Sequence, residues 1–402
     1  MCGGQSMSVT MDTEEFYDES DEVQTTKHYT PPLVELSLEN ITYSPVTRRV
    51  ASHSMLDKVK SKFRQQTKNN VEARSSNRTT ILHNITTTIS PYKLTAWMGP
   101  SGSGKTSLLT IATGLFSPED LSPNSCIKVN GSSDALPKRF VGLVWQDDLL
   151  LSNLTVEETV TFAAVLKAPS QASSSSEKKV EILEIVNQTM RQLNLTKIRN
   201  SLIGGGISGG ERKRVAVAVE LVSRPSILLL DEPTSGLDAT SAQSLIYNLK
   251  ELASIGHSIV AVVHQPRTTI YQMFDKLLLL SQGRVVYNGD AVHAQRCIEA
   301  CDGVRALPPM TGIADWIMDV ITEDEKRAAQ RHFSYSTNDD DDEEEGNKSR
   351  RQLLPTHFTK WSKEEGTVDI STDRRQLLRR LSTVKQLKSA PKFNTSFFTQ
   401  LI

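Results

Sequence analysis

The sequence predicts an α/β fold built on a mostly parallel β-sheet. From Thr95 to His264, short apolar runs alternate with glycine-rich turns and with segments whose apolar residues recur every three or four positions, a pattern typical of strands alternating with helices. One glycine-rich turn lies between an apolar strand and a helix-compatible run, which is the setting of a phosphate-binding loop. The 402 residues are enough for two or three domains, or for one large α/β domain with disordered ends.

Composition is that of an ordinary globular protein. Hydrophobic residues make up 38% of the sequence, charged residues 23%, and the formal net charge is −1. This balance provides no global positive field, so we expect no nucleic-acid partner. The four cysteines form no C-x-x-C pair, and Cys297 and Cys301 lie one helical turn apart, so we expect reduced thiols. The polar, acidic start and the lack of a run of about eighteen apolar residues predict neither a signal peptide nor a membrane span.

The N-terminal part is expected to hold a disordered tail and an antiparallel β subdomain. Residues 1–32 are acidic and lack periodicity, so they have too little apolar surface to offset the entropy of ordering. Alternating residues from Leu33 to Tyr43 predict a strand, and strands resume near Ile81. The basic insertion between them, residues 44–80, is interpreted as a solvated hairpin loop, with contact to anionic lipid as the less favoured alternative.

An α-helical subdomain at about 147–225 is expected to be inserted into a domain of residues 33–325. The segment Thr155–Glu158 matches a capping box and predicts a helix start. The Ser173–Ser176 run is interpreted as a flexible loop between two helices. The second helix is predicted by the spacing of Leu183, Val186, Met190 and Leu193.

The C-terminal part is expected to be a linker followed by a connector. Residues 326–372 include the acidic run Asp339–Glu345, which repels itself and cannot contribute to a core. Residues 373–402 are basic and then apolar, and the chain ends within an apolar run, so we expect it to be truncated. The segment Arg379–Ser382 is similar to a basophilic kinase site, although a solvated helix face is the favoured interpretation.

The strongest chemical signal is the run Gly99–Thr106, which matches G-x-x-x-x-G-K-[ST] between the apolar strand Leu94–Met98 and a helix-compatible segment. Its glycines let backbone N–H groups converge on phosphate oxygens. We expect Lys105 to reach the β- and γ-phosphates of a nucleotide and Thr106 to bind Mg²⁺. The expected nucleotide-binding residues are Gly99, Pro100, Ser101, Gly102, Ser103, Gly104, Lys105, Thr106 and Ser107.

Two carboxylates, Asp231 and Glu232, end the apolar strand Ser226–Leu230. Because unpaired carboxylates at a buried strand end are costly, an ion or a reacting water explains them better than chance. We expect Asp231 to bind Mg²⁺ and Glu232 to accept a proton from the attacking water. Kinases, GTPases and ATPases all remain compatible with these residues.

The segment Ile207-Ser208-Gly209-Gly210-Glu211 distinguishes between these classes, because it resembles the signature motif of ABC-type ATPases. Ser208 and two glycine N–H groups would stand at the start of a helix and form a second anion-binding terminus. In the ABC family the phosphate loop of one domain faces the signature of its partner. The resemblance therefore implies a homo- or heterodimer of nucleotide-binding domains.

The remaining motifs of the ABC family occur in the family's order. The resemblance implies that Gln146 contacts Mg²⁺ and senses the attacking water, that Asp238 belongs to the inter-domain loop, and that His264 contacts the γ-phosphate. Tyr43 is a candidate for the aromatic that stacks on adenine, and a packing role is equally favoured.

Residues 33–325 are similar to the G (White) subfamily of ABC transporters in several segments, among them Gln146–Asp148, Ser208–Arg214, Val263–Pro266 and Gly283–Gly289. The resemblance implies a P-loop NTPase (RecA-like) core that binds ATP and Mg²⁺ and hydrolyses ATP to drive translocation. It also implies a half-transporter with a C-terminal transmembrane domain absent from this chain, which exports a lipid, sterol or other hydrophobic substrate. The present domain would then be the cytosolic part of a membrane protein.

Two other classes of function are less consistent with the sequence. A soluble ABC ATPase without transport function would need two nucleotide domains in one chain or a long coiled coil, and the sequence has neither. A nucleotide-binding regulator that never hydrolyses is disfavoured because Glu232, Gln146 and His264 are all retained. One departure from the ABC pattern is Ser90-Pro91-Tyr92-Lys93, which replaces the usual Pro-Gly-Glu turn.

Overall fold

The computed structural model describes residues 30–45, 78–133, 136–169, 174–335, 354, 355, 357 and 358. The expected N-terminal tail, nearly all of the basic insertion, the acidic run Asp339–Glu345 and the C-terminal connector with Ser382 lie outside the described residues.

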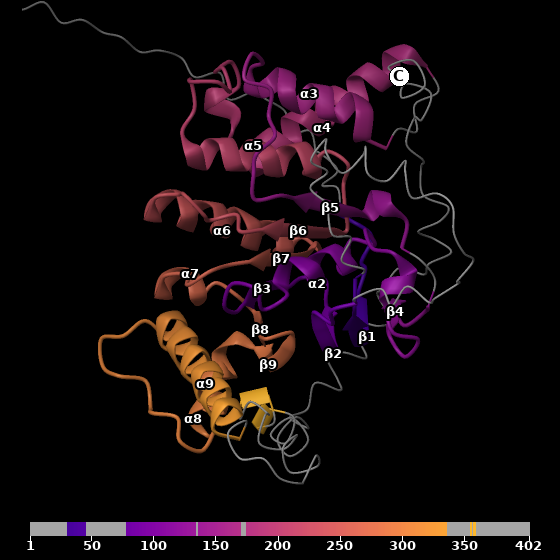
Figure 1. Ribbon diagram of the computed structural model, residues 1–402. Helices are drawn as coiled ribbons and strands as arrows, with labels where there is room; N and C mark the ends of the chain where they lie inside the picture. Colours follow the sequence, from indigo (N-terminus) through magenta and orange to yellow (C-terminus); the bar gives the residue numbers. More distant parts are fainter. Residues whose placement is uncertain are drawn as a thin grey trace, which may run out of the picture. The chain divides into compact units, whose positions relative to one another are not determined.

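Two β-sheets form the framework of the described part (Figure 1). The smaller sheet is antiparallel, with the order β2-β1-β4, and the larger sheet has the order β5-β6-β7-β3-β8-β9. In the larger sheet β5, β6, β7, β3 and β8 run parallel, and β9 pairs antiparallel with β8. The strands are β1 (Leu36–Tyr43), β2 (Leu82–Ile89), β3 (Leu94–Met98), β4 (Cys126–Val129), β5 (Val141–Val144), β6 (Ile227–Asp231), β7 (Ser258–Val262), β8 (Lys276–Ser281) and β9 (Arg284–Asp290). The predicted α/β fold with a mostly parallel sheet and an N-terminal antiparallel region is confirmed.

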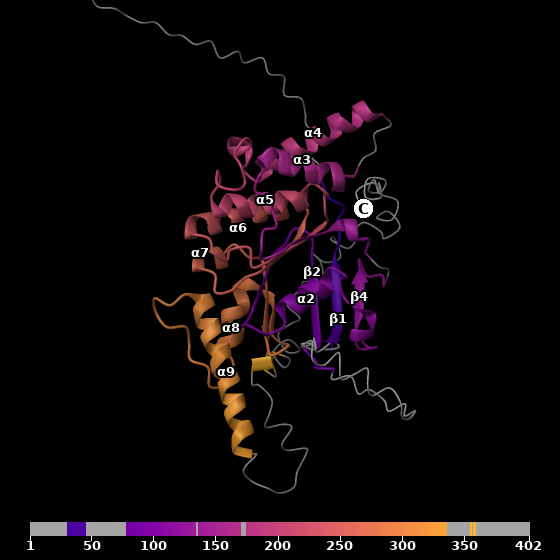
Figure 2. The same ribbon diagram turned by 45° about the horizontal axis from the view of Figure 1, so that its top comes forward.

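The helices are arranged in groups around the larger sheet. Figure 1 shows α3, α4 and α5 together beyond β5, with α8 and α9 together beyond β9, and Figure 2 shows the same two groups of helices. The first group lies within the range expected for the helical subdomain. The α-helices are α2 (Lys105–Ala112), α3 (Val156–Lys167), α4 (Ser175–Gln192), α5 (Gly209–Leu221), α6 (Ala239–Ser254), α7 (Thr268–Tyr271), α8 (Ala294–Glu299) and α9 (Ile313–Tyr335). Short 3₁₀ turns occupy Pro118–Asp120, Lys138–Phe140, Thr196–Ile198 and Ala291–His293.

The larger sheet is buried on both faces. Every residue of β3, β6 and β7 is buried, which explains why these strands are continuous apolar runs rather than alternating ones. Alternate residues serve opposite cores: Leu228 and Leu230 of β6 pack with helices α3 to α6, whereas Ile227 and Leu229 pack with α2 and the smaller sheet. Because successive side chains of a strand point to opposite faces of the sheet, the residues of β6 contribute to two cores.

Both helices of the α3–α4 pair begin with a capping box. At α3 the Thr155 side chain accepts from the Glu158 N–H while Glu158 reaches back to Thr155, as predicted. The serine run, expected as a loop, instead starts α4: Ser174 is its N-cap and exchanges the same pair of hydrogen bonds with Glu177. The expectation for this run was wrong because Ser174-x-x-Glu177 is itself a capping box.

The predicted apolar repeat of α4 is only partly buried. Val186, Met190 and Leu193 are at most 2% exposed, whereas Leu183 is 53% exposed. One turn at the start of the repeat therefore faces away from the core.

Helix α9 continues to Tyr335, ten residues past the boundary expected at 325. Contacts around position 325 stabilise the helix where the linker was expected to begin. The Ser281 hydroxyl donates to Glu325 (2.5 Å), and the Leu354 N–H donates to the buried Asp324 (3.4 Å). Within the helix, Arg327 pairs with Glu323 one turn away (2.7 Å). Charged composition alone therefore placed the start of the linker too early.

The three described cysteines, Cys126, Cys297 and Cys301, are not in disulfide bonds, in agreement with the expectation of reduced thiols. Burial raises the pKa of the Cys301 thiol to about 11. None of the helices among the described residues has the length and apolar character needed to cross a membrane.

Candidate active site

The expected site residues follow four neighbouring parallel strands. Gly99 follows β3, Gln146 follows β5, Asp231 ends β6 and His264 follows β7. Since β5, β6, β7 and β3 are adjacent and parallel, their carboxyl ends meet at one edge of the sheet. This edge is where open α/β sheets bind ligands.

The phosphate loop between β3 and α2 needs glycine at its two ends. Gly99 has a φ of 149° and Gly104 a φ of 99°, a backbone region that favours glycine. A Cβ at Gly99 would lie 2.1 Å from the Leu280 carbonyl oxygen, and one at Gly104 would lie 2.4 Å from Leu82 Cδ2. The loop is therefore tightly seated on β2 and β8.

Lys105, the first residue of α2, folds back over this loop. Its Nζ donates to the carbonyl oxygens of Gly99 (2.7 Å) and Pro100 (2.8 Å). Burial lowers the pKa of Lys105, and the nearby carboxylates of Glu232 and Asp231 oppose that shift. The ammonium is thus held inside the loop that would surround phosphate oxygens.

Thr106 and Asp231 meet across the start of α2 and the end of β6. The Thr106 hydroxyl donates to Asp231 Oδ2 at 3.2 Å, and Asp231 is only 6% exposed. Burial raises the pKa of Asp231, and the Thr106 hydrogen bond acts in the opposite direction. Hydroxyl and carboxylate oxygens are ligands that Mg²⁺ prefers, so this pair fits a magnesium ion.

Glu232 turns out of the sheet at the residue after β6. Its φ is 46°, which is uncommon for a non-glycine residue and redirects the backbone at this point. The Gln146 amide Nε2 donates to Glu232 Oε2 at 3.0 Å. The structure therefore brings together two side chains that are 86 positions apart in the sequence.

The signature residues form the start of α5. Ser208 is the N-cap, and its N–H and hydroxyl both donate to Glu211 Oε2, at 2.7 Å and 2.8 Å. The hydrogen bond from the Ser208 backbone lowers the pKa of Glu211. Ser208 and Gly209 are exposed, Gly210 is buried and Ile207 is half-buried. Within the part of the chain that the structure describes, no hydrogen bond joins this motif to the phosphate loop.

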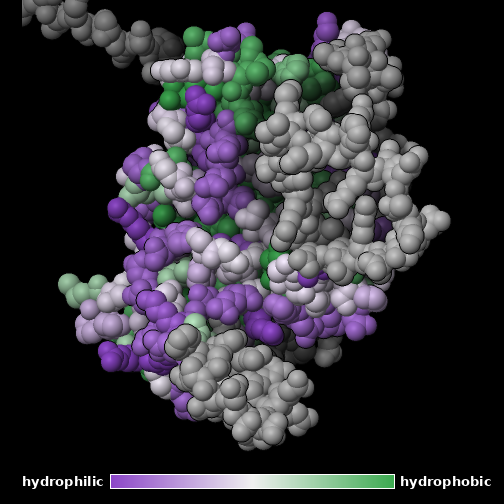
Figure 3. Space-filling view, viewed as in Figure 1, coloured by the Kyte–Doolittle hydropathy of each residue, from purple (hydrophilic) through white to green (hydrophobic). Residues whose placement is uncertain are grey.

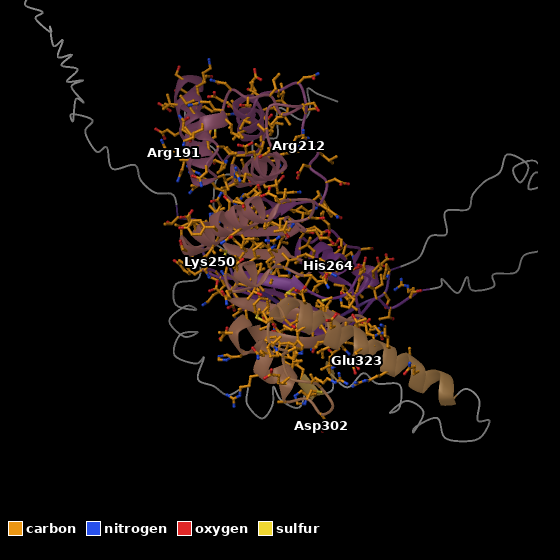
Figure 4. The ribbon with its side chains drawn as sticks, turned by 90° about the vertical axis from the view of Figure 1, so that its left-hand side faces the viewer. Arg191, Arg212, Lys250, His264, Asp302 and Glu323 are labelled. Carbon is orange, nitrogen blue, oxygen red and sulfur yellow. The ribbon has the colours of Figure 1, made fainter. Side chains whose placement is uncertain are left out.

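The remaining expected residues lie in separate places. Asp238 caps α6 by accepting from the N–H groups of Thr240 (3.1 Å) and Ser241 (3.0 Å). His264 is exposed after β7, at the level of the sheet, whereas Arg212 of α5 lies in the helical layer (Figure 4). Tyr43 ends β1 half-buried, and burial raises its pKa.

Sequence reasoning missed one feature of the site, the ion pair between Lys213 and Asp148. The two atoms Lys213 Nζ and Asp148 Oδ1 are 2.7 Å apart, with the side chains 4% and 12% exposed. Both residues lie within segments that resemble the G subfamily, Gln146–Asp148 and Ser208–Arg214. Neither segment carries a local signal for their pairing.

Comparison with known proteins supports the same interpretation. Residues 82–235 match the family described as ABC transporter. Over 252 residues the chain is 41% identical to ABC transporter G family member 26 of Arabidopsis thaliana, covering 60% of this chain and 35% of that protein. Over 290 residues it is 38% identical to member 21 of the same organism, covering 70% and 41%. It is 38% identical to the broad substrate specificity ATP-binding cassette transporter ABCG2 of Bos taurus, covering 61% and 36%.

Among solved structures, cbiO1 of Clostridium perfringens, part of the ABC transporter complex cbiONQ, aligns with a TM-score of 0.49 at 21% identity. That alignment covers 67% of this chain and 92% of that chain. The present chain spans between 35% and 41% of the length of the three curated relatives above.

A parallel sheet whose carboxyl edge carries a phosphate loop and an acidic strand end, with a signature helix in the same chain, defines an ABC-type ATP-binding domain. The similarity to G-family transporters identifies the subfamily of this domain. The chain carries an ABC transporter ATP-binding domain of the G-family type.

Proposed function

We propose that this domain binds ATP together with Mg²⁺ and hydrolyses ATP to ADP and phosphate, and that the reaction drives export of a hydrophobic substrate. The observation that carries the proposal is the 3.2 Å hydrogen bond between the Thr106 hydroxyl and the buried Asp231 carboxylate. It joins the phosphate loop to the acidic strand end beside Glu232. Phosphoryl transfer needs these two parts in contact.

Each residue has a distinct chemical role in this proposal. Lys105 neutralises phosphate charge from within the loop, and Thr106 and Asp231 hold the metal. Mg²⁺, when bound, would offset the charge that develops on the phosphate oxygens. Glu232 accepts a proton from the attacking water, and the Gln146 amide orients the Glu232 carboxylate.

His264, after the neighbouring strand β7, is proposed to contact the γ-phosphate, and Tyr43 to stack on adenine. The nucleotide contacts of the loop, Gly99 to Ser107, follow from the same placement at the start of α2.

A second nucleotide-binding domain is the proposed partner across the ATP. Ser208 and Gly209 are exposed at the N-terminus of α5, where the helix dipole favours an anion. In the single chain this terminus makes no hydrogen bond with the phosphate loop among the described residues. The ATP that contacts this helix terminus would be bound by the phosphate loop of the partner domain. Asp238 would lie in the loop between the two domains.

The proposed second partner is a transmembrane domain of the same protein. Figure 3 shows hydrophobic residues gathered over the end of the domain formed by α3 to α5. Exposed apolar side chains of this region are Leu149 (89%), Leu151 (63%), Phe162 (52%) and Leu202 (52%). Such a patch indicates a docking surface for another protein part. The class of substrate, a lipid, sterol or other hydrophobic molecule, rests on the resemblance to the G subfamily.

The test is a pair of variants of the intact protein, Glu232→Gln and Lys105→Ala. Glu232→Gln keeps size and hydrogen-bonding capacity but removes basicity, so Mg-ATP binding should persist while hydrolysis falls by about 10² to 10⁴-fold. Lys105→Ala removes the charge inside the loop, so both binding and hydrolysis should be lost. Radiolabelled ATP retention and phosphate release measure the two effects separately.

Glu220→Gln, a carboxylate on α5 outside the site, is the matched control and should hydrolyse ATP like the wild type. Wild-type turnover in Glu232→Gln would contradict the assignment of the proton acceptor. Wild-type ATP retention in Lys105→Ala would contradict the phosphate loop.

A further inference from the structure

A buried ammonium links the signature helix to the loop that carries Gln146. Lys213 lies in the second turn of α5, and its side chain is 4% exposed. An ammonium in such a place is unfavourable unless it is paired and hydrogen-bonded. Lys213 meets that condition through two acceptors on one loop, Asp148 Oδ1 at 2.7 Å and the Gln146 carbonyl oxygen at 2.9 Å.

The loop has few other anchors. Residues 145–150 follow β5, and within the described part of the chain their polar contacts with other elements are those with Lys213 and with Glu232. Leu149 is 89% exposed, whereas the next residue, Leu150, is partly buried against the hydrophobic core. Among the described residues, the two contacts of Lys213 are the polar contacts that fix the loop relative to α5.

Gln146 is held at both ends of the residue. Lys213 binds its backbone carbonyl, and its side-chain amide donates to Glu232 Oε2 at 3.0 Å. A displacement of α5 would thus move the backbone from which the amide reaches Glu232. The same helix starts with the exposed signature residues Ser208 and Gly209.

We propose that Lys213, through its ion pair with Asp148, is a positioning residue that couples the signature helix to the orientation of Glu232. The inference rests on the proposed function of Glu232 and adds a residue that acts on it through Gln146. When the signature binds a partner's nucleotide, the position of α5 becomes fixed. Because Lys213 of α5 binds the Gln146 carbonyl, the Gln146 backbone is fixed as well, and the Gln146 amide then aligns the Glu232 carboxylate. Loss of the Lys213 ion pair should therefore lower the rate of ATP turnover more than it weakens ATP binding.

The test removes both partners of the pair in the intact protein. Lys213→Met alone leaves a buried carboxylate unpaired and can unfold the chain, whereas Lys213→Met/Asp148→Asn removes both charges and avoids that penalty. We expect the double variant to keep its KM for ATP within about 3-fold while kcat falls by about 10- to 100-fold. Lys213→Arg, which keeps the charge, should restore part of kcat.

The matched control removes another ion pair of the same helix. Lys167 of α3 and Glu220 of α5 are 2.5 Å apart, and among the described residues no hydrogen bond or ion pair joins either side chain to residues 145–150. Lys167→Met/Glu220→Gln should therefore keep the wild-type kcat. A wild-type kcat in the Lys213 double variant, or equal losses of kcat in the two double variants, would overturn the proposal.

A second measurement reports on the loop without turnover. Trp145 precedes Gln146 and is 43% exposed, whereas Trp97 and Trp316 are buried. Acrylamide quenching of Trp145, obtained by difference from Trp145→Phe, should increase in the Lys213 double variant and stay unchanged in the Lys167 double variant. Unchanged quenching in both would overturn the positioning role. If the wild type itself fails to hydrolyse ATP while the quenching difference is present, the proposed function fails and the structural coupling stands.

Discussion

At the scale of single residues, His257 is a polar side chain that is buried beside a group that satisfies it. His257, between α6 and β7, is 2% exposed, and its Nδ1–H donates to the Pro225 carbonyl oxygen at 2.8 Å. A carbonyl can only accept, so this hydrogen bond requires the proton on Nδ1. Burial lowers the pKa of His257 to about 4.

Because the pKa of His257 is lowered in the folded protein, we expect the protein to lose stability in mild acid. Below pH 6.5 the unfolded chain takes up a proton at His257, but the folded chain does so only below about pH 4. The stabilising contribution is therefore complete above pH 6.5 and is lost as the pH falls towards 4, by about 3 kcal/mol in total. Urea unfolding at a series of pH values should show this loss in the wild type.

His257→Asn is the reference for this measurement, because asparagine keeps an N–H donor near Pro225 and does not titrate. The difference in unfolding free energy between wild type and His257→Asn should be constant above pH 7 and should change by about 3 kcal/mol towards pH 4. Parallel curves for the two proteins would show that His257 does not become charged on unfolding.

At the scale of elements, α5 combines several functions in thirteen residues. Its first turn carries the signature, its second turn carries Lys213, and its buried face packs on α6. The helices α5 and α6 lie close together at Gly210, where an added Cβ would lie 2.6 Å from Ser241 Cβ. Glycine at this position is therefore required by packing between helices as well as by any ligand contact.

Substitutions at two adjacent glycines of α5 should have different effects on stability. Gly210→Ala forces α5 away from Ser241 and should destabilise the protein by about 1–3 kcal/mol, more than the roughly 0.5–1 kcal/mol gained by alanine in a helix. Gly209→Ala meets only Leu237 Cδ2 at 3.5 Å, an ordinary contact, so it should be neutral or slightly stabilising. Chemical denaturation of the two variants measures both effects, and equal stabilities would refute the packing argument.

At the scale of the whole molecule, the proposed ATP sandwich would use two separate features of each chain. The phosphate loop is at the start of α2 and the signature at the start of α5, with no hydrogen bond between them among the described residues. Two chains in head-to-tail orientation would enclose two ATP molecules. Each ATP would then join the loop of one chain to the signature of the other.

Crosslinking in the intact protein tests this arrangement. In the Glu232→Gln background, cysteines introduced at Ser101 and Gly209 should crosslink between two chains with Mg-ATP, and at least about 10-fold less without nucleotide, because ATP would provide most of the affinity. Adding Ser208→Arg should abolish the crosslink by obstructing the signature. Ser176→Arg, at an exposed position early in α4, is the control and should leave the crosslink unchanged. A crosslink that forms equally with and without ATP would rule out the nucleotide sandwich.

The local parts of this protein could be predicted from its sequence. The continuous apolar runs predicted the buried strands β3, β6 and β7, and the glycine spacing predicted the phosphate loop. These features depend on residues that are neighbours in the chain, where pattern and backbone preference determine the conformation. The start of α4 could also have been predicted from the sequence, because Ser174 and Glu177 form a local capping box.

Only the tertiary structure decided which distant residues meet. Gln146 reaches Glu232 because β5 and β6 pair in parallel register, and Lys213 reaches Asp148 because α5 packs beside β5. The middle of α9 is held at Asp324 and Glu325 by contacts with Leu354 and Ser281, which a pattern of charges within the helix does not reveal. Strand order, helix packing and burial fix these contacts between segments far apart in the chain, and a local pattern carries no information about its partner.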